Sequence, residues 1–154
     1  MSSPRTRETG PIRMSLSSRF ENIEMVQHLC TKLLNGRELP EETRHWVSMA
    51  LREALANAIK HGNEQNVSKR VRLEMDLAGD VLEIRIRDEG RGFDPEKVDD
   101  PLSPENRLKT SGRGIFYMKT FMDEVQFRRL DEGGMEIVLR KNLAHAEKKE
   151  EKGT

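Results

Sequence analysis

One stretch of this chain carries polar residues at a spacing that suits work on a phosphate group. Glu53, Asn57 and His61 follow one another at intervals of four residues, so on a helix they project from one face. A carboxylate and a carboxamide one turn apart can hold a hydrated Mg²⁺ and a water or hydroxyl, since Mg²⁺ prefers oxygen ligands and keeps several waters. An ordinary amphipathic helix with a polar stripe explains the same spacing, so this stretch needs support from elsewhere.

A second segment suits recognition of an amine. Asp88 is followed by Gly90 and Gly92, where an alternating strand pattern ends. A carboxylate at a strand end can accept a hydrogen bond from an exocyclic amine, and glycines let the backbone approach a ligand closely. A simple glycine-rich turn is the alternative.

A third segment suits an anion. Gly112, Arg113 and Gly114 follow Ser111 and precede an apolar helical pattern. Free N–H groups and the positive end of the helix dipole favour phosphate at such a place. A helix start capped by Ser111 is the alternative, and the segment lacks the Lys-Ser/Thr ending of a Walker A loop.

Hydropathy periods predict the elements that position these segments. Helical spacing covers 20–34, a stretch from Pro40 to about His61, and 114–122, while strands are expected over 12–17, 70–77, 81–88, 124–130 and 135–140. Together these helices and strands predict an α+β fold, a two-layer sandwich with a mixed, mostly antiparallel sheet and its helices on one face.

Composition narrows the class of protein. Charged residues make up 35% of the 154 residues and the formal net charge is zero, so nothing indicates a direct nucleic-acid partner. No apolar run approaches the roughly 20 residues that span a membrane. Cys30 is the one cysteine, which excludes an intrachain disulfide and fits a cytoplasmic setting. A flexible arm (1–11) and a charged tail (143–154) are expected to flank one domain (12–142).

The order of the three segments resembles the N, G1 and G2 boxes of the GHKL (Bergerat-fold) ATPase superfamily. Residues 122–125, Met-Asp-Glu-Val, and the compact length resemble its anti-sigma serine/threonine-protein kinase branch in particular. The resemblance covers roughly 12–142 and implies ATP and Mg²⁺ as cofactors.

The resemblance also implies residue roles in the helix segment. Glu53 matches the family's general base and Asn57 its Mg²⁺ ligand. Lys60 matches a phosphate contact, and His61 packs or bonds nearby.

The resemblance implies roles for the loops as well. Asp88 matches the adenine reader, with Gly90 and Gly92 shaping its pocket. Gly112 and Gly114 match the phosphate loop, Arg113 a contact to the terminal phosphates, and 96–111 the ATP lid.

One departure from the family pattern concerns the last hairpin. The family often places a threonine beside the adenine, whereas Met135 follows Gly133 and Gly134 here. The change removes a hydroxyl from the expected pocket, although a bridging water to Asp88 can survive without it.

The activity implied by the resemblance is transfer of the ATP γ-phosphoryl group to a serine of an anti-anti-sigma-type protein. The same family suggests a sigma factor held in an alternative complex, and a homodimer built through the first strand and helix. A nucleotide-gated module that sequesters a partner without turnover is the alternative, and a histidine-kinase catalytic domain is a weaker one. Trp46 is expected in the core, with a partner contact as the less favoured alternative, while Phe93, Phe116 and Phe121 are expected to serve packing.

Overall fold

The predicted helices and strands are all present in the computed structural model, which describes residues 10–90 and 113–144. The strands are β1 (Ile12–Ser17), β2 (Arg70–Ala78), β3 (Val81–Arg87), β4 (Glu124–Arg129) and β5 (Met135–Asn142). The helices are α1 (Glu21–Leu34), α2 (Glu41–Asn57), the π-helix η1 (Ala58–Gly62) and α3 (Arg113–Phe121). The predicted lid and most of the predicted arm and tail lie outside the described residues.

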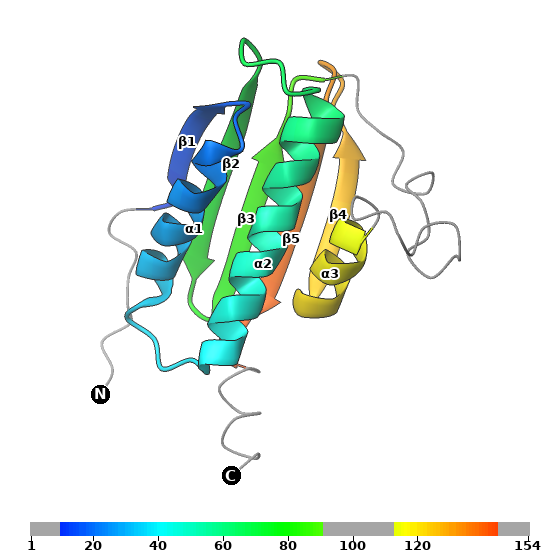
Figure 1. Ribbon diagram of the computed structural model, residues 1–154. Coiled ribbons are helices and arrows are strands. Elements are labelled where there is room, and N and C mark those ends of the chain that lie inside the picture. The colour runs from blue at the N-terminus through cyan, green and yellow to red at the C-terminus, as the bar shows by residue number, and fades with distance from the viewer. Residues whose placement is uncertain (1–9, 91–112, 145–154) are drawn as a thin grey trace.

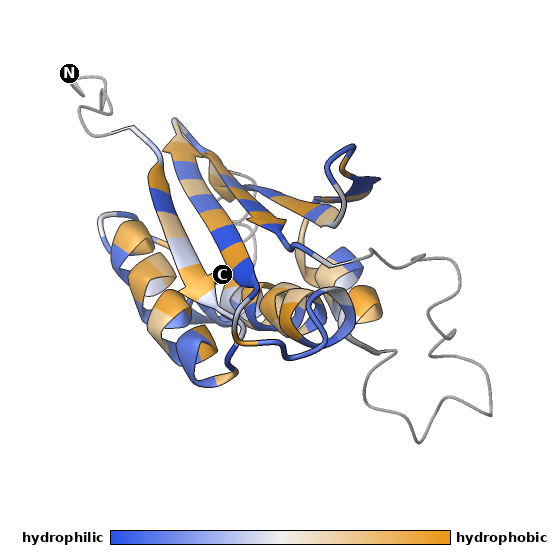
Figure 2. Ribbon diagram, turned by 90° about the horizontal axis from the view of Figure 1, so that it is seen from above, coloured by the Kyte–Doolittle hydropathy of each residue, from blue (hydrophilic) through white to orange (hydrophobic). Residues whose placement is uncertain are grey.

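The five described strands form one sheet in the order β1-β2-β3-β5-β4, and each neighbouring pair is antiparallel. All three α-helices cover the same face of this sheet, with α2 between α1 and α3 (Figures 1 and 2). The predicted two-layer α+β sandwich is therefore confirmed. No described helix is both long and apolar enough to cross a bilayer.

Alternation along the strands separates a buried face from a charged one (Figure 2). Val71, Leu73 and Met75 of β2 are at most 2% exposed, whereas the residues between them are charged. The period of two sends the apolar side chains toward the helices.

Helix α2 lies over the centre of the sheet because its inner face is built from small residues. Ala50, Ala54 and Ala58 are at most 1% exposed, next to fully buried Val47 and Leu51. Small side chains let the helix axis approach the strands closely. Glu53 lies on the side of α2 that faces α3, so the packing of α2 determines where the predicted catalytic residues stand.

The open face of the sheet is held by ion pairs around one buried carboxylate. The Glu136 side chain is only 2% exposed and pairs with Arg85, Arg87 and Arg128 from both neighbouring strands. Several cations around one acid compensate the loss of its hydration.

The single cysteine lies on the inner side of α1. Cys30 is 2% exposed, and burial raises the pKa of its thiol to about 12. A thiol that stays protonated is a poor nucleophile, so Cys30 is a structural residue of the core.

Candidate functional site

Glu53 projects from α2 toward the start of α3. A Cβ added to Gly114 would lie 2.7 Å from Glu53 Oε2, so only glycine lets the first turn of α3 approach this carboxylate so closely. Burial raises the pKa of Glu53, and the charge of Arg52 opposes the rise. A carboxylate with a raised pKa is a stronger base, which suits proton abstraction near neutral pH.

Asn57, one turn further on, is buried at 5% exposure. Its side-chain nitrogen has no hydrogen-bond partner among the described residues. Amide nitrogen and oxygen are interchangeable by a 180° flip, so this buried amide can turn its oxygen toward a ligand. An unsatisfied buried amide costs free energy, which a ligand would relieve.

Lys60 and His61 complete this wall of the site. Together with Glu53 and Asn57 they line an open cavity of about 710 Å³, whose other wall is the first half of α1. Burial lowers the pKa of His61, and the charge of Lys60 lowers it further. His61 is therefore neutral at pH 7, and the exposed cations of this wall are Lys60 and Arg52.

The helical spacing holds only as far as Asn57. Residues 58–62 form the π-helix η1, in which the Asn63 N–H bonds to the Ala58 carbonyl. The expectation of one continuous α-helix to His61 is therefore wrong in its last turn. The wider turn shifts His61 out of the strict four-residue series, although His61 still lines the same cavity. Such π-turns are common at functional sites.

Asp88 stands at the end of β3 with its carboxylate buried and held by the backbone. Its Oδ1 accepts hydrogen bonds from the N–H groups of Gly90 at 3.0 Å and Met135 at 3.1 Å. A side chain at Gly62 would overlap Oδ2, so the backbone of η1 passes directly against this oxygen. Burial raises the pKa of Asp88, and the two backbone N–H groups oppose the rise.

The last hairpin supports Asp88 through its backbone, which clarifies the methionine at position 135. Gly134 has φ +92°, and a Cβ there would overlap the Asp88 carbonyl oxygen. The Met135 N–H reaches Asp88 whatever side chain the residue carries, and the methionine side chain itself is 1% exposed. The missing threonine hydroxyl thus leaves this support of the carboxylate in place.

Asn63 is a positioning residue that the sequence analysis missed. It is fully buried; its Oδ1 accepts the Glu89 N–H at 2.7 Å, and its Nδ2 donates to Ser18 Oγ and the Arg70 carbonyl. One amide therefore ties the end of η1 to the Asp88–Glu89 turn. The only available signal was a helix-ending Gly-Asn pair, which usually indicates a cap.

The described residues bring the predicted site together around η1. Glu53 and Asn57 lie before it, and Asp88 packs against its last residue, Gly62, while lining a separate cavity of about 250 Å³. Gly90 lies against the backbone of Gly62, and Gly114 lies against Glu53. Of the other predicted site residues, Gly92, Gly112 and the side chain of Arg113 lie outside the described residues, as does the predicted lid over 96–111.

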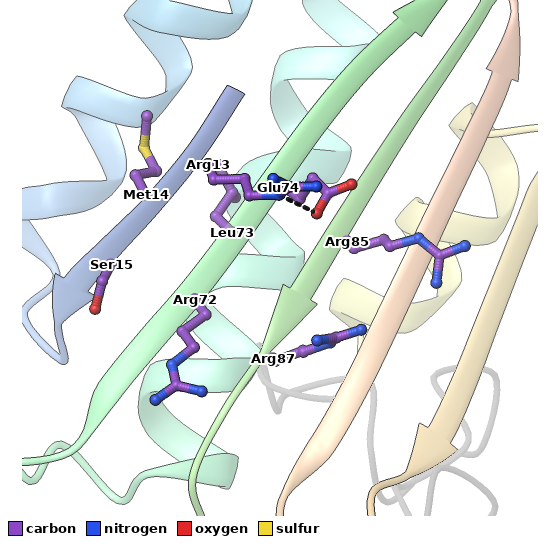
Figure 3. A pocket seen from close by; sticks show the side chains of 8 residues that line it. All are labelled: Arg13, Met14, Ser15, Arg72, Leu73, Glu74, Arg85 and Arg87. Carbon is purple, nitrogen blue, oxygen red and sulfur yellow. Dashed lines mark hydrogen bonds and ion pairs between the residues drawn. The ribbon is translucent and has the colours of Figure 1, made fainter. Parts of the chain in front are cut away.

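A further cavity, of about 430 Å³, lies on the open face of the sheet (Figure 3). Its lining is rich in cations, among them Arg13, Arg72, Arg85 and Arg87, and Arg13 pairs with Glu74 at 3.0 Å. None of the predicted site residues lines it. The candidate chemistry therefore belongs to the helical layer and the strand ends beside it.

A family profile described as the histidine kinase-like ATPase domain matches residues 16–141, a range that includes every predicted site residue. The chain belongs to this family. It is 26% identical over 142 residues to the serine-protein kinase RsbW of Oceanobacillus iheyensis, covering 88% of the chain and 89% of that protein. It is 37% identical over 100 residues to the anti-sigma F factor of Bacillus subtilis, covering 64% of the chain and 68% of that protein.

A solved structure supports the fold independently. The RsbU and RsbW domains of a Mycobacterium tuberculosis protein superpose with a TM-score of 0.62 at 18% identity, over 88% of this chain and 33% of that one. These matches confirm the resemblance to the GHKL superfamily and to its anti-sigma serine-kinase branch.

Proposed function

We propose that this member of the histidine kinase-like ATPase family is a serine-protein kinase that uses ATP to phosphorylate an anti-anti-sigma-type protein and that acts as an anti-sigma factor. The observation that carries the proposal is the placement of Glu53, whose carboxylate touches the start of α3 and stands one helical turn before the buried Asn57. The names of its relatives, a serine-protein kinase and an anti-sigma factor, support the same assignment.

The described residues fit Mg²⁺ and ATP. Asn57 offers a buried amide without a hydrogen-bond partner among them, which suits an oxygen ligand to Mg²⁺. No group of three His, Cys, Asp or Glu side chains in 10–90 and 113–144 can hold a metal by itself. The remaining ligands of the ion would therefore come from phosphates and water. Asp88 engages Oδ1 with two backbone N–H groups and would offer Oδ2 to the amine of a base.

The chain's own residues would then divide the work of phosphoryl transfer. Asp88, oriented by two backbone N–H groups, accepts a hydrogen bond from the adenine amine. Lys60 and the first turn of α3 attract the phosphates. Glu53 takes the proton of the serine hydroxyl, and its burial strengthens it as a base. Bound Mg²⁺ supplies neutralisation of the phosphate charge.

The wider setting of this kinase follows from the same assignment. A sigma factor is the partner held when the anti-anti-sigma protein is not engaged. A homodimer and a cytoplasmic location complete the proposal.

The experiment combines the purified chain with Mg·ATP and recombinant anti-anti-sigma-type proteins encoded by the same genome. Phosphoserine on one of them, detected by mass spectrometry and absent with Glu53→Gln, is the expected result. If the wild-type chain binds such a protein in the presence of nucleotide but never phosphorylates it, the chain is a nucleotide-gated binding module instead.

A further inference from the structure

Four aromatic side chains of α2 and α3 contact one another in series. Trp46 of α2 stacks on Phe121 of α3, with ring centroids 5.6 Å apart and planes within 6°. Tyr117 stacks on the other side of Phe121 at 5.9 Å, and Phe116 meets Tyr117 edge-on at 5.9 Å. These four of the chain's seven aromatic residues are called the aromatic ladder below.

The core uses α3 through its inner residues and through Phe121, which packs against the core cluster. Ile115 and Met118, on the inner side of the helix, are 8% and 0% exposed and anchor it to the sheet. Phe116 is 44% exposed, and the other three rings are half-buried. The expectation that Phe116 serves packing is therefore wrong. A helix that is apolar on nearly all sides is usually buried, yet the outer side of α3 remains in contact with solvent.

The aromatic ladder lies next to the proposed catalytic base. Trp46 precedes Glu53 by seven residues, two turns on the same face of α2, which corresponds to about 10 Å along the helix. Phe116 follows Gly114, the residue that contacts Glu53, by two positions. The Trp46 end of the ladder therefore lies two turns from Glu53 on α2, and the Phe116 end lies within one turn of Gly114, on a different side of α3.

The area that a protein partner covers indicates whether the ladder would lie within its interface. A folded partner that delivers a hydroxyl to Glu53 must cover the surface around that carboxylate. A stable interface buries about 800 Å² on each partner, roughly a disc of 16 Å radius. The ladder falls inside such a disc, and exposed aromatic rings are the side chains that most often dominate binding energy.

We propose that the aromatic ladder is the docking platform for the protein substrate. The proposal rests on the proposed kinase function and names the chemistry of the partner, an apolar surface that flanks the acceptor serine. The ladder would supply affinity and orientation, and Glu53 would act on the hydroxyl. Trp46 lies sixteen residues before Gly62, about 24 Å along the helix axis, so ATP recognition at Asp88 is separate from it.

The main test uses the recombinant anti-anti-sigma-type protein that the wild-type chain phosphorylates. Phe116→Ala should lower kcat/KM for this protein by about 10- to 30-fold, the loss typical of an interface anchor, and leave the KM for ATP unchanged. Phe116→Leu should retain part of the activity because it keeps an apolar side chain. Val67→Ala, which truncates a similarly exposed side chain (49%) in the turn before β2, is the matched control and should have no effect.

Trp46 supplies a second readout because it is the only tryptophan of the chain. Adding a tryptophan-free version of the partner should shift Trp46 emission to shorter wavelength and protect it from iodide, with weaker affinity in Phe116→Ala.

Three results would overturn the platform. In the first, Phe116→Ala matches Val67→Ala in transfer and in binding. In the second, Phe116→Ala alters the sedimentation of the chain alone, which would assign the ladder to a contact between copies. The third concerns the kinase function itself: if the wild-type chain neither binds nor phosphorylates any such protein, the proposed function fails, and the platform fails with it.

Discussion

The adenine assignment makes its sharpest prediction at Asp88, through a change of one atom. In Asp88→Asn the side chain must still accept the N–H groups of Gly90 and Met135, which lie 3.0 and 3.1 Å from Oδ1. The amide oxygen must therefore take the Oδ1 position. The new NH₂ group is then forced into the Oδ2 position beside Gly62, where it would face the amine of the base.

The size of the effect follows from that geometry. Losing a hydrogen bond to a charged acceptor costs about 1.5–3 kcal/mol, or roughly 10- to 150-fold in Kd. A donor facing a donor places Asp88→Asn at the upper end. Folding should not suffer, because burial raises the pKa of Asp88 and a neutral amide avoids the cost of burying a charge. The thermal midpoint without nucleotide should therefore stay the same or rise at pH 7.

Calorimetric titration with Mg·ATP, paired with thermal unfolding, measures both quantities. The matched control is Glu89→Gln, a neighbouring carboxylate whose 39% exposed side chain pairs with Arg72 at 3.9 Å. It should bind ATP as the wild type does. Wild-type affinity should also weaken as the pH falls through the raised pKa of Asp88, and Asp88→Asn should lack this dependence. A folded Asp88→Asn variant with wild-type affinity would refute the adenine assignment.

Three further predictions concern catalysis, Mg²⁺ binding and the hairpin beside Asp88. Glu53→Gln should keep its affinity for ATP but lose about 10²- to 10⁴-fold in the single-turnover rate of phosphate transfer. In the wild type this rate should fall as the pH drops through the raised pKa of Glu53. If Glu53→Gln transfers phosphate as fast as the wild type, Glu53 is not the base. Asn57→Ala should weaken ATP binding measured with Mg²⁺ much more than binding measured in EDTA, and equal losses would argue against a metal ligand. Gly134→Ala should destabilise the fold by about 2–5 kcal/mol in urea unfolding, because strain at φ +92° adds to overlap with a backbone oxygen. Gly79→Ala, at φ +59° with open space around it, should cost only about 1 kcal/mol, and similar losses for the two glycines would contradict the overlap.

Local patterns were sufficient to predict the elements of this fold. The period of two in β2 and β3 and the helical period in α1 and α2 arise from burial of one face, which every strand or helix of this sandwich shares. The same patterns could not predict the π-helix at 58–62, because one wider turn at the end of a helix shifts only the last few side chains. The exposure of Phe116 could not be predicted either, because an apolar residue in a helical pattern does not show whether another part of the fold covers it.

The sequence by itself determined which residue types were available for the site and in what order. Glu53 and Asn57 were visible because they lie one helical turn apart, and Asp88 because glycines follow the end of a strand. Only the tertiary structure decided how these segments meet: Gly114 against Glu53, Gly62 against the Asp88 carboxylate, and the Met135 N–H against the same carboxylate from 47 residues away. Asn63 became a positioning residue for the same reason, since its partners lie on three other segments. Such contacts depend on how closely two backbone segments approach each other in the folded chain. The spacing of residues along the sequence does not give the distance between those segments.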